Sequence, residues 1–273
     1  MTYTELCERL RLAGIENAEW DAALLLEHFC GADLRTLRAE TEREYDSPSL
    51  LRAVEQREAR YPLQYLLGEW QFYRQTYEVG PDCLIPRSDT EILVEEAIRL
   101  LPPNAYFADL CTGSGCIAVS VLCERPDTRA LAVDKFPNTL AVAERNAVRQ
   151  GVEDRMEALC ADVLSSVHVS DRPLDAILSN PPYIPTKEID GLAREVSAEP
   201  RAALDGGEDG LIFYRGILQM QAELLKPEGF LLFEVGYDQA DAVVALGKKY
   251  GFFVSRVIRD YGGTRRVVYL ARE

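Results

Sequence analysis

The chain has 273 residues, enough for one large and one small domain. Hydrophobic residues make up 47% and charged residues 27%, as is typical of a soluble globular protein, and no run of about 18 apolar residues predicts a membrane span. The net charge of −15 argues against a protein that grips nucleic acid across a broad surface, and it suits a basic partner.

Residues 1–60 predict helices alone. Leu6 and Leu10 belong to an apolar stripe at helical spacing, and a second periodic segment, 17–31, ends at Gly31, as helices often do. The predicted helices are short, as in a small helical bundle.

Residues 61–86 have a different character, because aromatic residues cluster there and the sequence "VGPD" marks a turn. This pattern predicts a β-hairpin that links two domains. Residues 87–101 then predict a helix, with Ser88 or Asp89 as N-cap and the negative charge of Glu91 in its first turn.

From residue 105 onward, apolar strands alternate with amphipathic helices, and two further strands end the chain. This alternation predicts an α/β, Rossmann-like fold: a mostly parallel, seven-stranded sheet with helices on both faces. In such sheets ligands bind beyond the carboxyl ends of the strands.

The first of these strands runs into a glycine turn, "FADLCTGSGCIA" (107–118). Gly113, Gly115 and Ala118 fit the spacing G-x-G-x-x-G/A, in which glycines let the backbone approach a ligand closely. Alone this glycine spacing is a weak signal, and it is also compatible with a nucleotide-binding redox protein.

Acidic residues mark the ends of three successive predicted strands. Asp109 precedes the glycine turn, Asp134 ends the next strand at the position where an acid can bind ribose hydroxyls, and Asp162 could accept from an adenine amino group. A dense anionic edge suits a cationic ligand better than a pyrophosphate. We therefore predict S-adenosylmethionine as the cofactor, with S-adenosylhomocysteine as its product.

The fourth strand of the domain ends in a rigid corner, "SNPPYIP" (179–185). Asn180 would face the methyl group of the cofactor. A planar –NH2 group is a poor nucleophile, and the Asn180 Oδ1 atom and the Pro181 carbonyl could accept its two N–H bonds and make the nitrogen more tetrahedral. The prolines, including Pro182, fix the geometry, and the Tyr183 ring would stack on the flat substrate group.

At these residues the chain resembles class I S-adenosylmethionine-dependent methyltransferases that act on amide or amino nitrogen. Five further segments resemble the PrmC/HemK family of release factor glutamine methyltransferases, and the similarity covers nearly the whole chain. These segments are 62–73, 84–98, 199–218, 233–239 and 259–268.

The resemblance implies methylation of the glutamine N5 atom in the Gly-Gly-Gln motif of class-1 peptide chain release factors. It also implies a helical domain, 1–60, that contacts the release factor, a hairpin linker, 61–86, and a methyltransferase domain, 87–273. A monomer is expected, with no direct contact to nucleic acid.

Site residues carried over from the family lie at matching positions. The cofactor loop is Cys111, Thr112, Gly113, Ser114 and Gly115, with Asp134 at the ribose, Val163 by the adenine, and Asn180, Pro181, Pro182 and Tyr183 around the glutamine. Cys111 stands where many relatives have the first glycine of the loop.

Two segments have alternative interpretations. Arg87 could shape the entrance for the glutamine or could only pair locally. The loop 203–210, "ALDGGEDG", could be a fixed turn before a helix or a mobile lid.

The corner chemistry also leaves other functions open. It would serve an adenine-N6 nucleic-acid methyltransferase, against which the net charge argues, or a glutamine methyltransferase of a ribosomal protein. A non-enzymatic binding module would leave the strand-end acids without a role.

Cysteine usage gives no sign of a metal or a disulfide framework. The seven cysteines form no Cys-x-x-Cys pair, and only two histidines are present. The start of the chain lacks the layout of a signal peptide. We expect a cytoplasmic protein with reduced thiols and no membrane partner.

Overall fold

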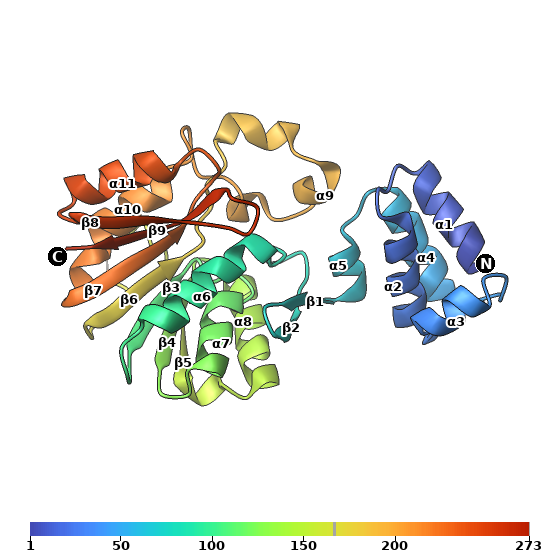
Figure 1. Ribbon diagram of the computed structural model, residues 1–273, viewed down its shortest axis with the longest axis horizontal. Coiled ribbons are helices and arrows are strands. Elements are labelled where there is room, and N and C mark those ends of the chain that lie inside the picture. Colours follow the sequence, from blue (N-terminus) through green and yellow to red (C-terminus); the bar gives the residue numbers. More distant parts are fainter. Residues whose placement is uncertain (166–167, 273) are drawn as a thin grey trace. The chain divides into compact units, whose positions relative to one another are not determined.

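A computed structural model describes residues 1–165 and 168–272, and this part of the chain divides into two compact units (Figure 1). The first unit comprises 1–69 together with 192–198, and the second comprises 70–191 together with 199 onward. The short return segment 192–198 lies far along the chain from the rest of its unit, and sequence patterns did not predict it.

The first unit is helical and has its own core. Its helices are α1 (Tyr3–Leu12), α2 (Ala18–Cys30), α3 (Leu34–Ala39), α4 (Pro48–Glu58), α5 (Leu63–Leu67) and the short α9 (Arg194–Ser197). A capping box between Thr2 and Glu5 begins α1, and Gly31 ends α2 in the left-handed conformation. The buried apolar faces of α1, α2 and α4 meet in one cluster.

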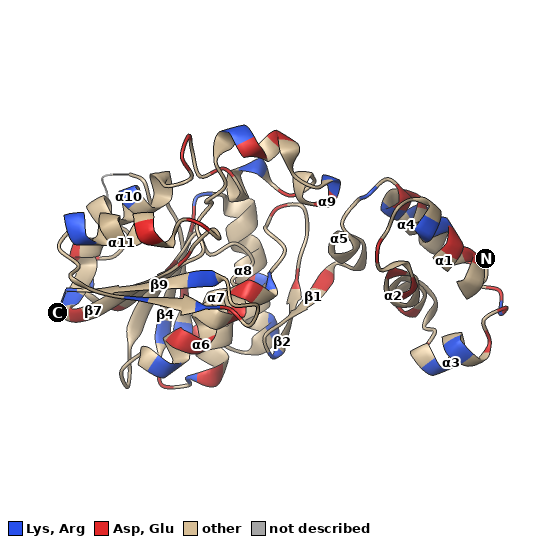
Figure 2. Cartoon of the chain, turned by 45° about the horizontal axis from the view of Figure 1, so that its top comes forward, with Lys and Arg blue, Asp and Glu red and all other residues tan. Residues whose placement is uncertain are grey.

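Ion pairs join the elements of this unit. Both α1 and α4 carry acidic and basic residues (Figure 2), and Arg9 of α1 contacts Glu58 of α4 at 2.8 Å. The buried Arg57 pairs with Asp21 at 2.7 Å and with Glu195 of α9 at 3.2 Å. This buried pairing explains why the return segment 192–198 belongs to the helical unit.

The predicted hairpin occupies a shorter range than 61–86. Its strands are β1 (Glu69–Phe72) and β2 (Gln75–Glu78), whereas the preceding segment forms α5. Tyr77 anchors the hairpin, because its buried hydroxyl lies 2.6 Å from the hydroxyl of Ser120.

Within residues 70–165 and 168–272, seven strands form one sheet in the order β5-β4-β3-β6-β7-β9-β8. They are β3 (Tyr106–Leu110), β4 (Arg129–Asp134), β5 (Met156–Cys160), β6 (Leu174–Ser179), β7 (Leu225–Glu234), β8 (Val254–Arg259) and β9 (Arg265–Ala271). The strands β3 to β7 pair in parallel, and β9 runs antiparallel to both of its neighbours. The predicted α/β, mostly parallel, seven-stranded fold is confirmed.

Helices cover both faces of this sheet (Figure 1). The helices α6 (Glu91–Leu100), α7 (Cys116–Glu124) and α8 (Pro137–Gln150) lie on one face, and α10 (Ile212–Met220) and α11 (Ala240–Lys249) lie on the other. Short 3-10 turns complete the unit: η1 (Ser88–Thr90), η2 (Glu153–Arg155), η3 (Thr186–Gly191), η4 (Arg201–Ala203) and η5 (Ala222–Leu224). Among the helices of the described residues, none is long and apolar enough to cross a membrane.

The sheet order places a switch point between β3 and β6. From β3 the chain proceeds outward to β4 and β5, and then crosses back to the opposite side of β3 to form β6. Ligands of doubly wound sheets bind at such a point, beyond the carboxyl ends of the strands.

Candidate active site

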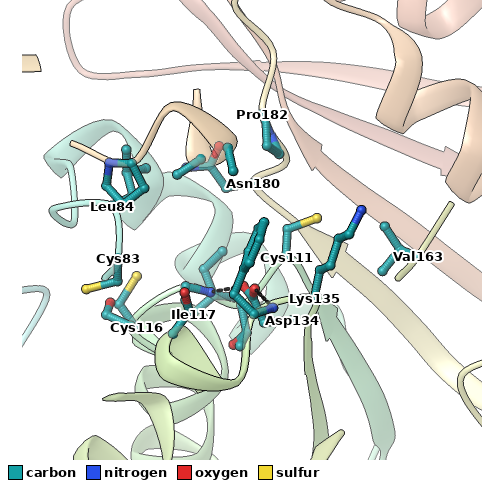
Figure 3. Close-up of a pocket in the computed structure, with 18 of the residues that line it drawn as sticks. Cys83, Leu84, Cys111, Cys116, Ile117, Asp134, Lys135, Val163, Asn180 and Pro182 are labelled. Carbon is teal, nitrogen blue, oxygen red and sulfur yellow. Dashed lines mark hydrogen bonds between the residues drawn. The ribbon is translucent and has the colours of Figure 1, made fainter. Parts of the chain in front are cut away.

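A cavity opens at the carboxyl ends of the strands on either side of the switch point (Figure 3). Ten of the predicted site residues line it: Arg87, Cys111, Thr112, Gly113, Ser114, Asp134, Asp162, Val163, Asn180 and Pro182. Four other predicted site residues do not line this cavity: Asp109, Gly115, Pro181 and Tyr183. The fold thus brings the loop after β3 and the corner after β6 to the same cavity.

The loop after β3 turns sharply through the left-handed region. Cys111, Gly113 and Gly115 have φ angles of +62°, +59° and +80°. A Cβ atom added at Gly115 would lie 2.9 Å from the Cβ atom of Ala143 in α8, so both the backbone angle and the close packing require glycine there. Cys111 adopts the same strained conformation with a side chain, at a cost of about 1 kcal/mol.

Asp134, the last residue of β4, holds this loop in place. Its Oδ2 atom accepts from the Gly113 backbone N–H at 3.1 Å, and its Oδ1 atom accepts from the Phe136 N–H at 3.1 Å. Burial raises the pKa of this carboxyl group, and the backbone donors oppose that shift. The side chain reaches the cavity wall, where a hydroxylated ligand could share its oxygens.

Asp109 lies beneath the loop, in contrast to the direct cofactor contact predicted for it. Its Oδ2 atom accepts from the Thr112 hydroxyl at 2.6 Å and from the Ala118 N–H at 3.1 Å. The side chain is fully buried, and burial raises its pKa to about 7. Asp109 therefore shapes the loop from below, and its Oδ1 atom has no hydrogen-bond partner among the described residues.

The third acid pairs with a cation that sequence reasoning missed. Asp162 lies 2.9 Å from the Nζ atom of Lys135, and its Oδ1 atom accepts from the Leu164 N–H at 2.9 Å. Burial favours a higher pKa for Asp162, but these partners outweigh it, so that the pKa is lowered. Val163, beside this ion pair, is buried and supplies an apolar surface to the cavity.

On the other side of the cavity, Asn180 follows β6, and its Nδ2 group donates to the Thr90 hydroxyl at 3.1 Å. Figure 3 shows Asn180 and Pro182 across the cavity from Asp134, with Cys111 between them. Tyr183 is half-buried and packs against the core of the sheet, and burial raises the pKa of its hydroxyl.

The glycine-rich loop 203–210 supports the Pro-Pro-Tyr corner. Ile184 pairs with it like a strand, donating to Leu204 O at 3.0 Å and accepting from Gly206 N at 2.9 Å. A Cβ atom at Gly206 would lie 2.7 Å from the Tyr183 Cα atom. These close backbone contacts favour a fixed support over the mobile lid among the two interpretations of this loop.

Arg87 lines the cavity, and its ion-pair partner lies far along the chain, in contrast to the local pairing that was one of its two predicted roles. Its guanidinium contacts the carboxylate of Glu199, whose side chain is almost completely buried and also accepts from the Ile85 N–H at 2.9 Å. Glu199 thereby joins the segment before η1 to the segment that begins with Pro200, and both segments contribute to the cavity wall.

Several lining residues escaped sequence reasoning. They include Leu84, Pro86, Thr90, Lys135, Phe136, Thr139, Ala202 and Phe213. These residues come from separate segments that only the fold brings together. For Lys135 and Phe136, their position directly after Asp134 in the sequence could have indicated that they line the cavity.

The donor set indicates what the cavity can hold. Within the described residues no cluster of three metal-ligating side chains occurs. Carboxylates at two strand ends, a glycine turn and apolar walls fit a cationic adenosyl cofactor: Asp134 for the ribose, the loop 111–115 for the amino-acid portion, and Val163 for the adenine.

The chain is similar to known proteins over most of its length. The model of the PrmC N-terminal domain matches residues 2–68, and that of the methyltransferase small domain matches residues 88–231. The release factor glutamine methyltransferase of Moorella thermoacetica is 41% identical over 268 residues, covering 96% of this chain and 94% of that protein. The protein of the same name from Geobacter sulfurreducens is 39% identical over 259 residues, covering 93% and 90%.

Among solved structures, a methyltransferase from Pyrococcus furiosus shares the fold with a TM-score of 0.54. It is 16% identical, and the alignment covers 72% of this chain and 88% of that one.

Proposed function

The chain belongs to the release factor glutamine methyltransferase family, and from this premise we propose its reaction. It transfers a methyl group from S-adenosylmethionine to the side-chain amide nitrogen of the glutamine in the Gly-Gly-Gln motif of class-1 peptide chain release factors. The products are N5-methylglutamine, S-adenosylhomocysteine and one proton, which the amide nitrogen loses to solvent.

One observation carries this proposal: residues 111–114 of the loop and the corner residues Asn180 and Pro182 line the same cavity, at the carboxyl ends of the adjacent strands β3 and β6. A cofactor held over the loop would have its reactive end near the corner. Two N–H acceptors there suit a planar nitrogen that carries two hydrogens.

The residues of this chain act by positioning. When bound, S-adenosylmethionine supplies an electrophilic methyl group. Asn180 Oδ1 and the Pro181 carbonyl accept the two N–H bonds of the glutamine amide, which favours a lone pair localised on the nitrogen and directed at that methyl group. The prolines keep both acceptors in place, so that little reorganisation precedes transfer. Tyr183 and Pro182 present flat surfaces to the amide.

Binding of the cofactor follows from the opposite wall. Asp134 accepts from the ribose hydroxyls, and Asp109 keeps Thr112 and the start of α7 in place beneath it. Asp162 and Val163 would contact the adenine, and Lys135 partly neutralises the negative charge of Asp162. Arg87 shapes the opening through which the glutamine enters.

The partner and the setting belong to the same proposal. The helical unit, which carries the match to the PrmC N-terminal domain, binds the release factor, and the enzyme acts as a monomer in the cytoplasm, where release factors act. The net charge of −15 supports a protein substrate over nucleic acid.

A competition experiment tests this assignment. The full chain is incubated with methyl-labelled S-adenosylmethionine and equal amounts of release factor, ribosomal protein mixture and DNA. We expect label in the release factor alone; label in DNA would support an adenine-N6 enzyme, and label in a ribosomal protein would redirect the substrate.

A further inference from the structure

The side chain of Asn180 could face the cavity with either its oxygen or its nitrogen, and the two orientations differ in chemistry. Only the carbonyl oxygen can accept an N–H bond from a substrate amide, whereas the –NH2 group can only donate. The role proposed for Asn180 therefore depends on a device that fixes the amide in one orientation.

Such a device is present behind Asn180. The Thr90 Oγ1 atom lies 3.1 Å from Asn180 Nδ2 and 2.5 Å from Glu234 Oε2. Thr90 and Glu234 are 2% and 1% exposed, so water does not compete for these hydrogen bonds. The three residues come from η1, the end of β7 and the segment after β6.

The direction of the hydrogen bonds follows from the number of protons. An ionised carboxylate can only accept, so the Thr90 hydroxyl donates its single hydrogen to Glu234. The Thr90 oxygen then has only lone pairs left for Asn180, and must accept from the –NH2 group. Asn180 Oδ1 consequently points away from Thr90 and toward the cavity.

Several charged and polar groups surround Glu234 and hold its carboxylate. Burial raises its pKa to about 7, whereas the hydrogen bond from Thr90 and the positive charge of Arg266 oppose that rise. Arg266 in turn contacts Asp89, the residue before Thr90, at 2.9 Å, and the Asp89 charge acts against that of Glu234. The Tyr214 hydroxyl donates to the Glu234 backbone oxygen at 2.8 Å.

We propose that Thr90 and Glu234 are positioning residues that orient the Asn180 amide with its oxygen toward the substrate nitrogen. This inference rests on the proposed methyl transfer to glutamine.

The test compares Thr90→Val, which removes the hydroxyl but keeps the shape, with Thr90→Ser, which keeps the hydroxyl. Thr128→Val is the matched control, because Thr128 is also fully buried and donates its hydroxyl to a backbone carbonyl, at the opposite end of the sheet. At pH 8, where Glu234 is ionised, we expect Thr90→Val to lower kcat about 10- to 100-fold with an unchanged Kd for S-adenosylmethionine. Thr90→Ser and Thr128→Val should stay within about threefold of the wild-type kcat.

A second readout does not depend on activity. The full chain is labelled with 15N-asparagine, and the resonance of the Asn180 side-chain –NH2 group is assigned by its loss in Asn180→Ala. The hydrogens of this group should exchange with solvent faster in Thr90→Val than in the wild type or Thr90→Ser. Should Thr90→Val not fold, Thr90→Ala carries the same expectations.

The outcomes separate the two proposals. A wild-type enzyme that methylates no release factor would refute the proposed function, while the exchange rates would still decide the orientation. Wild-type kcat in Thr90→Val, or an unchanged exchange rate of the Asn180 amide, would overturn the positioning role.

Discussion

The backbone nitrogen of Gly113 lies 3.1 Å from the Oδ2 atom of Asp134, so the carboxylate at the end of β4 fixes the glycine loop that follows β3. The other oxygen of Asp134 accepts from Phe136 at the start of α8. A single side chain thus connects the two loops that would surround the ribose of the cofactor.

Replacement of Asp134 by alanine should weaken cofactor binding. The substitution removes the predicted ribose acceptor and also the bond that holds Gly113, so we expect Kd for S-adenosylmethionine to rise at least about tenfold, measured by calorimetry. Asp154→Ala, at an exposed acid in η2, is the control. An unchanged titration for Asp134→Ala would count against the ribose role.

The two glycines of the loop should differ in their tolerance of alanine. Both have positive φ, which costs an alanine about 1 kcal/mol. At Gly115 the added Cβ atom also meets Ala143 at 2.9 Å, whereas at Gly113 it meets no atom of the described protein within 4 Å. Urea denaturation should show a loss of unfolding free energy that is about 1–3 kcal/mol larger for Gly115→Ala. Equal losses would show that packing against α8 is not tight.

The support of the corner by the loop 203–210 predicts a selective loss of turnover. In Gly206→Ala the Cβ atom would displace Tyr183, and we expect kcat for the release factor to fall about tenfold or more while the cofactor Kd stays constant. Gly191→Ala is a matched control, since its Cβ atom would meet no atom of the described residues within 4 Å. A Gly206→Ala enzyme with full activity would mean that the corner tolerates movement.

The buried Glu234 should make stability depend on pH. Its folded-state pKa is raised from 4.5 to about 7, so its contribution to stability is fully present below pH 4.5 and is lost as the pH rises toward 7. Asp109 behaves in the same way. Glu234→Gln lacks this titration. In urea unfolding, the free energy of unfolding of Glu234→Gln minus that of the wild type should therefore be about 2–3 kcal/mol larger at pH 7.5 than at pH 5. The same difference in unfolding free energy between Glu234→Gln and the wild type at both pH values would contradict the raised pKa of Glu234.

The helical unit offers a test of docking. Trp20 is 57% exposed on α2, where a large aromatic side chain could anchor a protein partner. We expect Trp20→Ala to lower kcat/KM for the intact release factor about tenfold or more, with the same kcat/KM as wild type for a short Gly-Gly-Gln peptide. Equal losses on both substrates would indicate a general defect and no docking role.

The strand ends were predictable because local patterns encode them. Apolar segments before Asp134 and Asn180 form buried strands, Asp162 follows the more exposed edge strand β5, and parallel strands bring such ends to one edge of the sheet. All three line the cavity. Asp109 differs because it lies within β3, one residue before the strand ends, and its side chain faces the underside of the loop.

The supporting residues could not be predicted, because their partners lie far along the chain. Thr90 and Asn180 are 90 positions apart, and Thr90 and Glu234 are 144 apart. No local periodicity indicates such a pairing. The same holds for Glu199 and Arg87, and for Glu195, whose pairing with Arg57 carries a distant segment into the helical unit.

The central claim is that Asn180 binds the side-chain amide of a release-factor glutamine and positions it for methylation. Its most direct measurement is mass spectrometry of a class-1 release factor after incubation with S-adenosylmethionine and either the wild-type enzyme or Asn180→Ala. We predict one added methyl group on the Gly-Gly-Gln glutamine with the wild type and none with Asn180→Ala, although that variant binds the cofactor normally. Methylation by Asn180→Ala at the wild-type rate, or a methyl group on any other residue, would contradict the account.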